Sequence, residues 1–242
     1  MGTIPERYVV ITGATSGIGL ALVNRLASEF NQNHRLHLCL LCRNMSKGSL
    51  VKQDIESHHK TVVVDLVKMD VSSVQSVRAA SQKIINMYSR IDCMYLNAGI
   101  MPVAKFNIPY VMKTMFTSEG LQMFKTGLGM FSANDGTTVD GVKNIFATNV
   151  LGHFILVDEV IPVLTSQNDQ HCAQIIWTGS TNASKKSFKL NDVTCKNGHV
   201  ADPGTAKTNI NKGFCCKLDM VLCYSIHVSV AVFFTKFNNN PI

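Results

Sequence analysis

The sequence has no low-complexity tract, no block of like charges and no internal repeat along its 242 residues. A linker between two domains would show as one of these changes in composition, so their absence predicts a single domain. With 46% hydrophobic residues, the chain has ample material for one globular core.

Little in the sequence favours a disulfide framework, a metal site or export. The eight cysteines include one C-x-x-C pair, Cys39 and Cys42, inside an apolar run typical of a strand. Residues three apart on a strand point to opposite faces, which prevents joint metal binding. No second pair has ligand spacing, and no N-terminal signal peptide is present. We therefore expect no metal, and reduced thiols in a cytosol-facing protein.

The sequence also lacks a basic stripe interleaved with aromatic residues, although its net charge is +7. Such an excess suggests an acidic partner: a phosphorylated cofactor, an anionic membrane surface or nucleic acid. Because the lysines are scattered, we expect no nucleic-acid partner. A generally basic, solvated surface accounts for most of the excess.

What the sequence does contain, close to its N-terminus, is the pattern of a strand, a glycine turn and a helix. A β-branched run over residues 8–12 precedes small residues and then an amphipathic stretch over residues 20–30. Glycines in such a turn allow the tight bend, the approach of a pyrophosphate and close packing of helix on strand. The helix N-terminus adds amide hydrogens and the positive end of its dipole. The predicted nucleotide-binding turn comprises Thr12, Gly13, Ser16, Gly17, Ile18 and Gly19.

Strand and helix patterns then alternate, which predicts an α/β fold with a doubly wound parallel sheet. Further strands are expected at residues 36–42, 61–69, 91–96 and 174–180. Helices are expected over residues 44–59, from Ser72 or Ser73 to about Tyr88, and over 139–164 with Thr138 as cap. Residues 100–136 show no regular pattern and are rich in methionine and phenylalanine, which is more typical of packing than of a substrate wall.

The residue after the second strand bears on the cofactor. NAD enzymes of this architecture place an acid there for the ribose 2′-hydroxyl, whereas an arginine can pair with a 2′-phosphate. This chain has Arg43. An exposed arginine at a strand end is also ordinary, but its place after the glycine turn favours NADP (NADPH).

The G-x-x-x-G-x-G spacing of residues 13–19 resembles the short-chain dehydrogenase/reductase family. Residues 36–47, 95–102 and 148–156 resemble its 3-keto-steroid reductases of sterol synthesis, and the likeness continues to Thr208. The resemblance implies a Rossmann-like fold and NADPH-dependent reduction of a 3-keto steroid or sterol, and of 17-keto steroids, to the hydroxy compound. A reductase of another lipid alcohol, such as a retinoid, is an alternative.

The resemblance also assigns cofactor contacts to individual residues. Asp70 would bond the adenine amino group, with helix capping as a competing role. The turn Asn97-Ala98-Gly99 would steady the sheet beside the adenine ribose. A loop closing over the cofactor would contain Pro203, Gly204 and Thr205.

For the reaction itself, the resemblance implies that Ser180 polarises the substrate carbonyl and that Asn149 holds a water for the proton relay. Serine after a strand is common, and a polar residue on a buried helix could equally be structural. Reduction of a ketone also needs a proton donor. The family uses a tyrosine with a lysine four residues later on the same helix face.

That Tyr-x-x-x-Lys pair is missing. Residues 181–202 contain no tyrosine, and they are rich in Lys, Asn and Gly, which predicts a loop where a crossover helix is expected. Tyr110 with Lys113 is one residue short, and Tyr224 has no lysine near it, so neither replaces the pair. The sequence therefore predicts very low activity. A catalytically inactive NADP-binding protein or a truncated variant is the alternative function.

The sequence further suggests a reductase domain over residues 1–212 and an apolar segment over residues 213–242. The apolar run at 220–234 is shorter than the ~20 residues of a spanning helix, which leaves a re-entrant or surface-lying anchor, a buried strand or a buried helix. By resemblance the protein would lie at the cytosolic face of the endoplasmic reticulum membrane, or in the cytoplasm if this segment does not anchor it. The missing helix would also remove part of the family's dimer interface.

Overall fold

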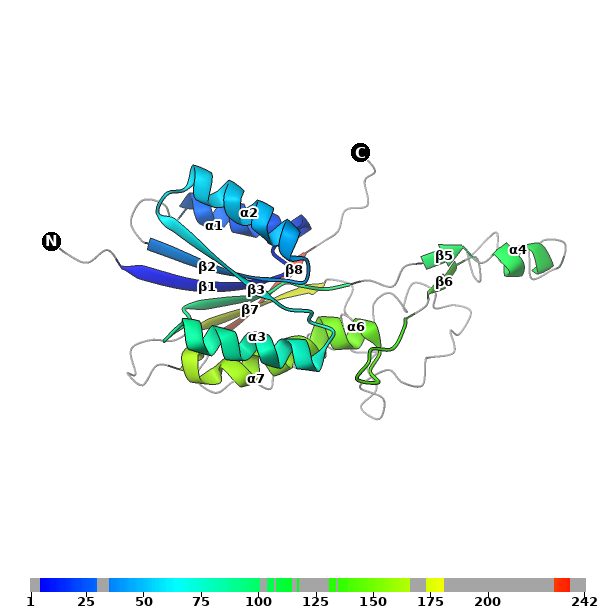
Figure 1. The fold of residues 1–242 in the computed structure, drawn as a ribbon. Helices are drawn as coiled ribbons and strands as arrows, with labels where there is room; N and C mark the ends of the chain where they lie inside the picture. The colour runs from blue at the N-terminus through cyan, green and yellow to red at the C-terminus, as the bar shows by residue number, and fades with distance from the viewer. Residues whose placement is uncertain are drawn as a thin grey trace.

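The computed structural model describes residues 5–29, 35–100, 104–106, 108–114, 117, 131–133, 135–165, 173–180 and 229–235. Within them, a six-stranded sheet has the order β3-β2-β1-β4-β7-β8 (Figure 1). Its strands are β1 (Glu6–Thr12), β2 (Arg35–Cys42), β3 (Val62–Lys68), β4 (Cys93–Leu96), β7 (Gln174–Ser180) and β8 (Ser229–Thr235). Every neighbouring pair is parallel, which confirms the predicted doubly wound sheet.

Helices cover both faces of this sheet (Figure 1). On one face lie α1 (Gly17–Glu29) and α2 (Met45–His58), and on the other lie α3 (Val74–Met87) and α7 (Gly152–Leu164). The helices bury residues three and four apart, as amphipathic helices do. In α3 these are Val77, Ala80, Ser81 and Ile84.

The two thiols of the C-x-x-C pair are separated by the sheet. Cys39 packs in the core beneath α3 and α7, while Cys42 packs in the core beneath α1 and α2. The predicted opposite orientation of the pair is thus confirmed. Asn44 caps α2, and Ser73 caps α3 by accepting a hydrogen bond from the Ser76 amide at 3.3 Å.

The helix expected to follow Thr138 begins later than the sequence suggested. Thr138 stabilises a tight turn, in which its hydroxyl oxygen accepts from the Val142 amide at 3.3 Å and Gly141 has a φ of 74°. A residue in that left-handed region does not continue a right-handed helix, so the expectation was wrong for residues 139–143. The helix starts with α6 (Asn144–Phe146), passes through the π-helix η1 (Ala147–Leu151) and continues as α7.

This continuous stretch, Asn144–Leu164, has the length and apolar composition of a membrane span, but 56% of its most apolar window is buried in the protein. Leu156 and Val160 of α7 belong to the core of the sheet. Packing in that core therefore accounts for its apolar character.

Within residues 100–136, where no regular pattern was expected, the structure contains short elements. Strands β5 (Ala104–Phe106) and β6 (Phe131–Ala133) form an antiparallel pair, and α4 (Ile108–Thr114) follows β5. All three lie away from the main sheet (Figure 1).

The apolar C-terminal segment contributes strand β8. It pairs with β7 from Gln174 opposite Ser229 to Ser180 opposite Thr235, which corresponds to the strand among the three alternatives for this segment. Residues 181–228 lie outside the described residues, and they include Pro203, Gly204 and Thr205. The absence of a crossover helix therefore stays a prediction.

Candidate active site at the carboxyl edge of the sheet

The candidate site lies where the chain leaves the carboxyl ends of the parallel strands. The strand order reverses at β1, with β2 and β3 on one side and β4 and β7 on the other. In open α/β sheets, ligands bind in the crevice outside the strand ends at such a switch point. The turn that begins at Gly13 and the turn that begins at Asn97 flank this crevice.

Close approach of backbone to backbone shapes the first turn. Gly13 has a φ of 68°, and a Cβ on it would lie 2.9 Å from the Ala98 Cα. A Cβ on Gly19 would lie 2.1 Å from the Gly13 carbonyl oxygen, so helix α1 can begin this close to the turn only with glycine there. Around Gly17, by contrast, no atom of the described residues lies within 4 Å of the Cβ position, apart from its chain neighbours and the backbone of its own helix. The turn is tight on its inner side and open on its outer side.

Thr12 joins the two turns. Its side chain is fully buried, and its hydroxyl oxygen accepts the amide hydrogens of Asn97 and Ala98, each at 2.9 Å. The Asn97 carboxamide nitrogen donates back to the carbonyl oxygens of Thr12 at 3.4 Å and Gly13 at 3.5 Å. The hydroxyl of Thr178 in β7 donates to the Asn97 side-chain oxygen at 3.3 Å. The Asn97-Ala98-Gly99 turn is thus tied to strands on both of its sides.

Arg43 and Asp70 follow β2 and β3 at the same edge. Arg43 is exposed and makes no hydrogen bond or ion pair with the part of the chain that the structure describes. The Oδ1 atom of Asp70 accepts from the amide and the hydroxyl of Ser72, at 3.0 and 2.7 Å. Asp70 therefore closes the turn before α3, while Ser73 caps the helix. Its Oδ2 atom has no partner within the described ranges.

Asn149 lies in the π-helix η1 with its side chain fully buried. Its Oδ1 atom accepts from the Ile100 amide at 2.8 Å, and its Nδ2 atom donates to the Ile100 carbonyl oxygen at 2.9 Å. Single π-turns inside helices are frequent at functional sites. Here the turn fixes the backbone that follows Gly99. Ser180 ends β7 at the same edge of the sheet.

The three tyrosines with described side chains do not supply an acid with a lowered pKa. A hydrogen bond to Glu6 raises the pKa of Tyr8, and burial raises the pKa of Tyr95 to about 12. Burial also raises the pKa of Tyr88, whose hydroxyl donates to Asp65 at 2.6 Å.

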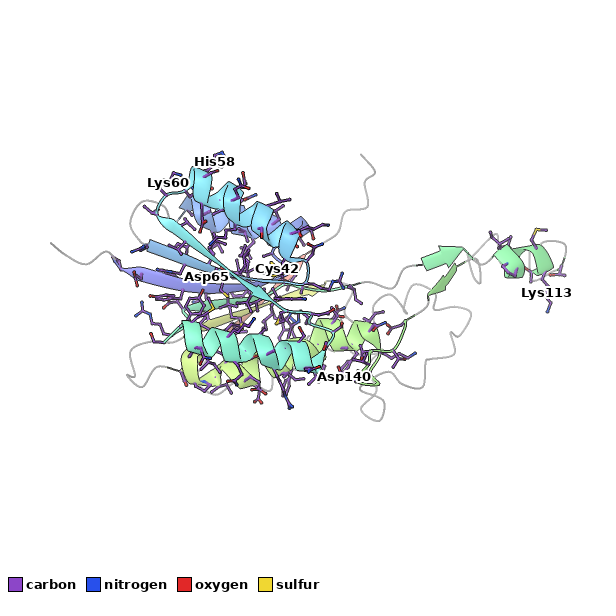
Figure 2. The ribbon with its side chains drawn as sticks, viewed as in Figure 1. Cys42, His58, Lys60, Asp65, Lys113 and Asp140 are labelled. Carbon is purple, nitrogen blue, oxygen red and sulfur yellow. The ribbon has the colours of Figure 1, made fainter. Side chains whose placement is uncertain are left out.

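The short pair Tyr110 and Lys113 belongs to α4. Figure 2 shows Lys113 far from the carboxyl edge of the sheet. Distance therefore adds to the spacing argument against this pair as a replacement for Tyr-x-x-x-Lys.

His153 was not among the site residues predicted from the sequence. This fully buried histidine in α7 places its Nε2 atom 2.9 Å from the Thr12 hydroxyl oxygen, within the junction between the two turns. A histidine on the inner face of an otherwise apolar helix, four residues after Asn149, was the signal that could have indicated it.

Comparisons with known proteins agree with this architecture. The sequence profile of the short chain dehydrogenase family matches residues 7–192. The human 3-keto-steroid reductase/17-beta-hydroxysteroid dehydrogenase 7 is 39% identical over 237 residues, covering 86% of this chain and 68% of the relative. The rat protein of the same name is 42% identical over 188 residues, covering 78% of this chain and 55% of the relative. The chain thus spans about two thirds of the human relative and about half of the rat one.

Among solved structures, the NADP complex of RhlG from Pseudomonas aeruginosa is similar, with a TM-score of 0.57 and 16% sequence identity. The match covers 93% of this chain and 70% of that chain. At that identity the likeness concerns the fold.

Proposed function

We propose that this chain, which belongs to the short chain dehydrogenase family, binds NADPH and serves the reduction of a 3-keto steroid or sterol to its 3-hydroxy compound. The observation that carries the proposal is the 39% identity to a 3-keto-steroid reductase over 237 residues. Reduction of 17-keto steroids belongs to the same proposal, because the name of that relative includes the second activity.

The geometry of the carboxyl edge supports a dinucleotide cofactor. The open backbone at Gly17 can receive a pyrophosphate at the start of α1. Asp70 keeps its Oδ2 atom to accept from the adenine amino group, and the exposed Arg43 guanidinium can pair with a ribose 2′-phosphate. Asn97, Ala98 and Gly99 form the opposite wall. We also propose that a loop containing Pro203, Gly204 and Thr205 closes over the cofactor.

When bound, NADPH supplies the hydride for the ketone. Ser180 is proposed to polarise the substrate carbonyl by donating its hydroxyl proton in a hydrogen bond. Asn149, which holds the backbone of Ile100, is also proposed to hold a water of the proton relay.

The developing alkoxide has no tyrosine–lysine pair to draw on in residues 181–202. General acid catalysis is worth roughly 10²–10⁴-fold. We propose that turnover is lower than in the human relative by about that factor, and that cofactor binding is the property this chain retains.

For the membrane we propose attachment at the cytosolic face of the endoplasmic reticulum, through residues 213–242. This rests on the resemblance alone, because strand β8 takes Ser229–Thr235 of that segment into the sheet. Membrane flotation of the expressed chain tests it. A chain that stays in the soluble fraction contradicts the attachment.

The function is tested by following NADPH consumption by the purified chain with a 3-keto sterol, with the human relative as positive control. A retinoid and a 17-keto steroid serve as competing substrates. Thermal unfolding with NADPH and with NADH reports binding in the same preparation.

We expect stabilisation by NADPH together with very slow, 3-keto-selective turnover. Turnover at the rate of the human relative contradicts the loss of the acid, and faster reduction of the retinoid contradicts the substrate. A chain that is folded but not stabilised by NADPH contradicts the cofactor proposal.

A further inference from the structure

His153 connects two parts of the candidate site that are distant in sequence. Its Nε2 atom lies 2.9 Å from the Thr12 hydroxyl oxygen at the end of β1, and its Nδ1 atom lies 3.4 Å from the Asn149 carbonyl oxygen in η1. All three residues are fully buried. The imidazole ring therefore bridges the nucleotide-binding turn and the helix that carries Asn149.

The hydrogen bonds around Thr12 determine which nitrogen of this ring carries the proton. A hydroxyl group has two acceptor lone pairs and one donor hydrogen. Both lone pairs of Thr12 are used by the amides of Asn97 and Ala98. Its hydrogen is left to donate, and the His153 Nε2 atom at 2.9 Å is a nearer acceptor than the Tyr95 carbonyl oxygen at 3.5 Å.

An accepting Nε2 atom requires a neutral imidazole with its hydrogen on Nδ1. The Nδ1 hydrogen then points to the Asn149 carbonyl oxygen, which accepts it. In this buried series of hydrogen bonds, each donor meets an acceptor. The Asn97 and Ala98 amides donate to Thr12, Thr12 donates to His153, and His153 donates to the Asn149 carbonyl oxygen. Leaving one of them without a partner would be costly in a buried setting.

We propose that His153 is a positioning residue for the cofactor: as the Nδ1-protonated tautomer, it accepts the Thr12 hydrogen bond and thereby fixes the two turns that flank the crevice. This inference rests on the proposed function, because it treats that crevice as the NADPH site. Without the Nε2 acceptor, the Thr12 hydroxyl turns its hydrogen elsewhere and holds the Asn97 and Ala98 amides less well.

The structure provides a natural reporter of this ring. Trp177 is the single tryptophan of the chain, and it is buried. Its ring contacts the His153 ring edge to face, with centroids 5.7 Å apart. Proton contacts with the indole therefore identify the His153 signals in an NMR spectrum without any substitution.

Three substitutions separate the roles of the two ring nitrogens. The amide of His153→Gln can occupy the Nε2 position and accept from Thr12, that of His153→Asn can occupy the Nδ1 position and donate to Asn149, and His153→Leu provides neither. We expect NADPH affinity within about threefold of the parent for His153→Gln, and a loss of about tenfold or more for His153→Asn and His153→Leu.

Matched variants show whether the effect passes through Thr12. Thr12→Val should weaken NADPH binding to a similar degree, and adding His153→Leu to it should cost little more, because both changes remove the same hydrogen bond. His58→Leu, at the exposed end of α2, is the control for loss of a histidine and should leave the affinity unchanged (Figure 2).

The tautomer is tested independently on the unsubstituted chain. Nitrogen NMR should show His153 with a bare Nε2 and a protonated Nδ1. The opposite tautomer overturns the inference, as does equal weakening by His153→Gln and His153→Leu, which would indicate a packing role. If the folded parent chain does not bind NADPH, the proposed function fails, while the tautomer measurement still decides the hydrogen-bond assignment.

Discussion

Gly152 lies so close to Val71 that a Cβ on the glycine would be 1.9 Å from the Val71 carbonyl oxygen. This contact joins the start of α7 to the segment that follows β3. It sets the depth of α7 against the sheet, and with it the positions of Asn149 and His153. Because the Val71 backbone lies against the backbone of α7, neither segment can shift far without a clash or a loss of this contact.

We therefore expect Gly152→Ala to lower the free energy of unfolding by about 3 kcal/mol, because the added methyl group must push α7 away from Val71. Urea unfolding measures this. Gly48→Ala is the matched control: it is also a helical glycine, but its Cβ would meet the flexible Cys42 side chain at 3.1 Å. In the control Gly48→Ala, the alanine also gains up to about 1 kcal/mol of helix propensity. An equal loss for both variants contradicts the specific role of the Val71 contact.

Asn149 should be sensitive to the charge of its replacement. In Asn149→Asp, one carboxylate oxygen faces the Ile100 carbonyl oxygen in a buried position, and we expect a loss of about 3 kcal/mol in unfolding free energy. Asn149→Ala should cost about 1–2 kcal/mol, because Ile100 is an exposed residue and its backbone can partly regain water. Asn24→Asp, on the exposed side of α1, is the control and should be nearly neutral. If Asn149→Ala is the more damaging change, the account of paired hydrogen bonds is wrong.

Arg43 should discriminate between the two nicotinamide cofactors. Arg43→Ala removes the proposed partner of the 2′-phosphate, and we expect NADPH binding to weaken by about 10- to 100-fold while NADH binding stays almost unchanged. Calorimetric titration with each cofactor measures this. Arg25→Ala removes an exposed arginine of α1 that pairs with Glu29, and it should change neither affinity. Equal losses for NADPH and NADH would contradict the assignment.

The buried thiols should make the fold sensitive to alkali. Burial raises the pKa of Cys39 from 9.0 to about 12 and the pKa of Cys42 and Cys93 to about 11. Above pH 9 the unfolded chain releases protons that the folded chain keeps, so stability is full below that pH and falls as pH rises toward 11. Each thiol contributes a slope of about 1.4 kcal/mol per pH unit.

Urea unfolding at intervals between about pH 8 and pH 10.5 checks this dependence. Replacing Cys93 by alanine should make the decline shallower by about one thiol's share. A free energy of unfolding that stays flat over this interval would show that the thiols ionise as easily in the folded chain as in the unfolded one.

The elements that the sequence predicted well are those that depend on local patterns of residues. The strands near residues 36–42, 61–69 and 174–180 were predicted to within a residue or so at each end. Runs of apolar residues bounded by turns carry that information in the sequence. The turn at Gly13 and the cap at Ser73 were also predictable, because each depends on a few neighbouring residues.

The start of the long helix shows where a local signal misleads. Thr138 has the residue type of a helix cap, yet it closes a turn. Gly141 adopts a left-handed conformation there, and the Asp135 carboxylate accepts from the Ile145 amide at 3.1 Å at the true helix start. Asp135 lies ten positions before Ile145, so the packing of the segment, and not a local cap pattern, brings its carboxylate to the helix start.

The sequence by itself determined the alternating elements, the glycine turn and the lack of a Tyr-x-x-x-Lys pair, because each is a pattern of residue types at short spacing. Only the tertiary structure decided that the C-terminal segment adds strand β8 beside β7. It also decided that Asn149 binds Ile100 and that His153 binds Thr12 across 141 positions. Those contacts depend on how α7 and the helical turn before it pack on the sheet, and the spacing of residues along the chain does not encode that packing.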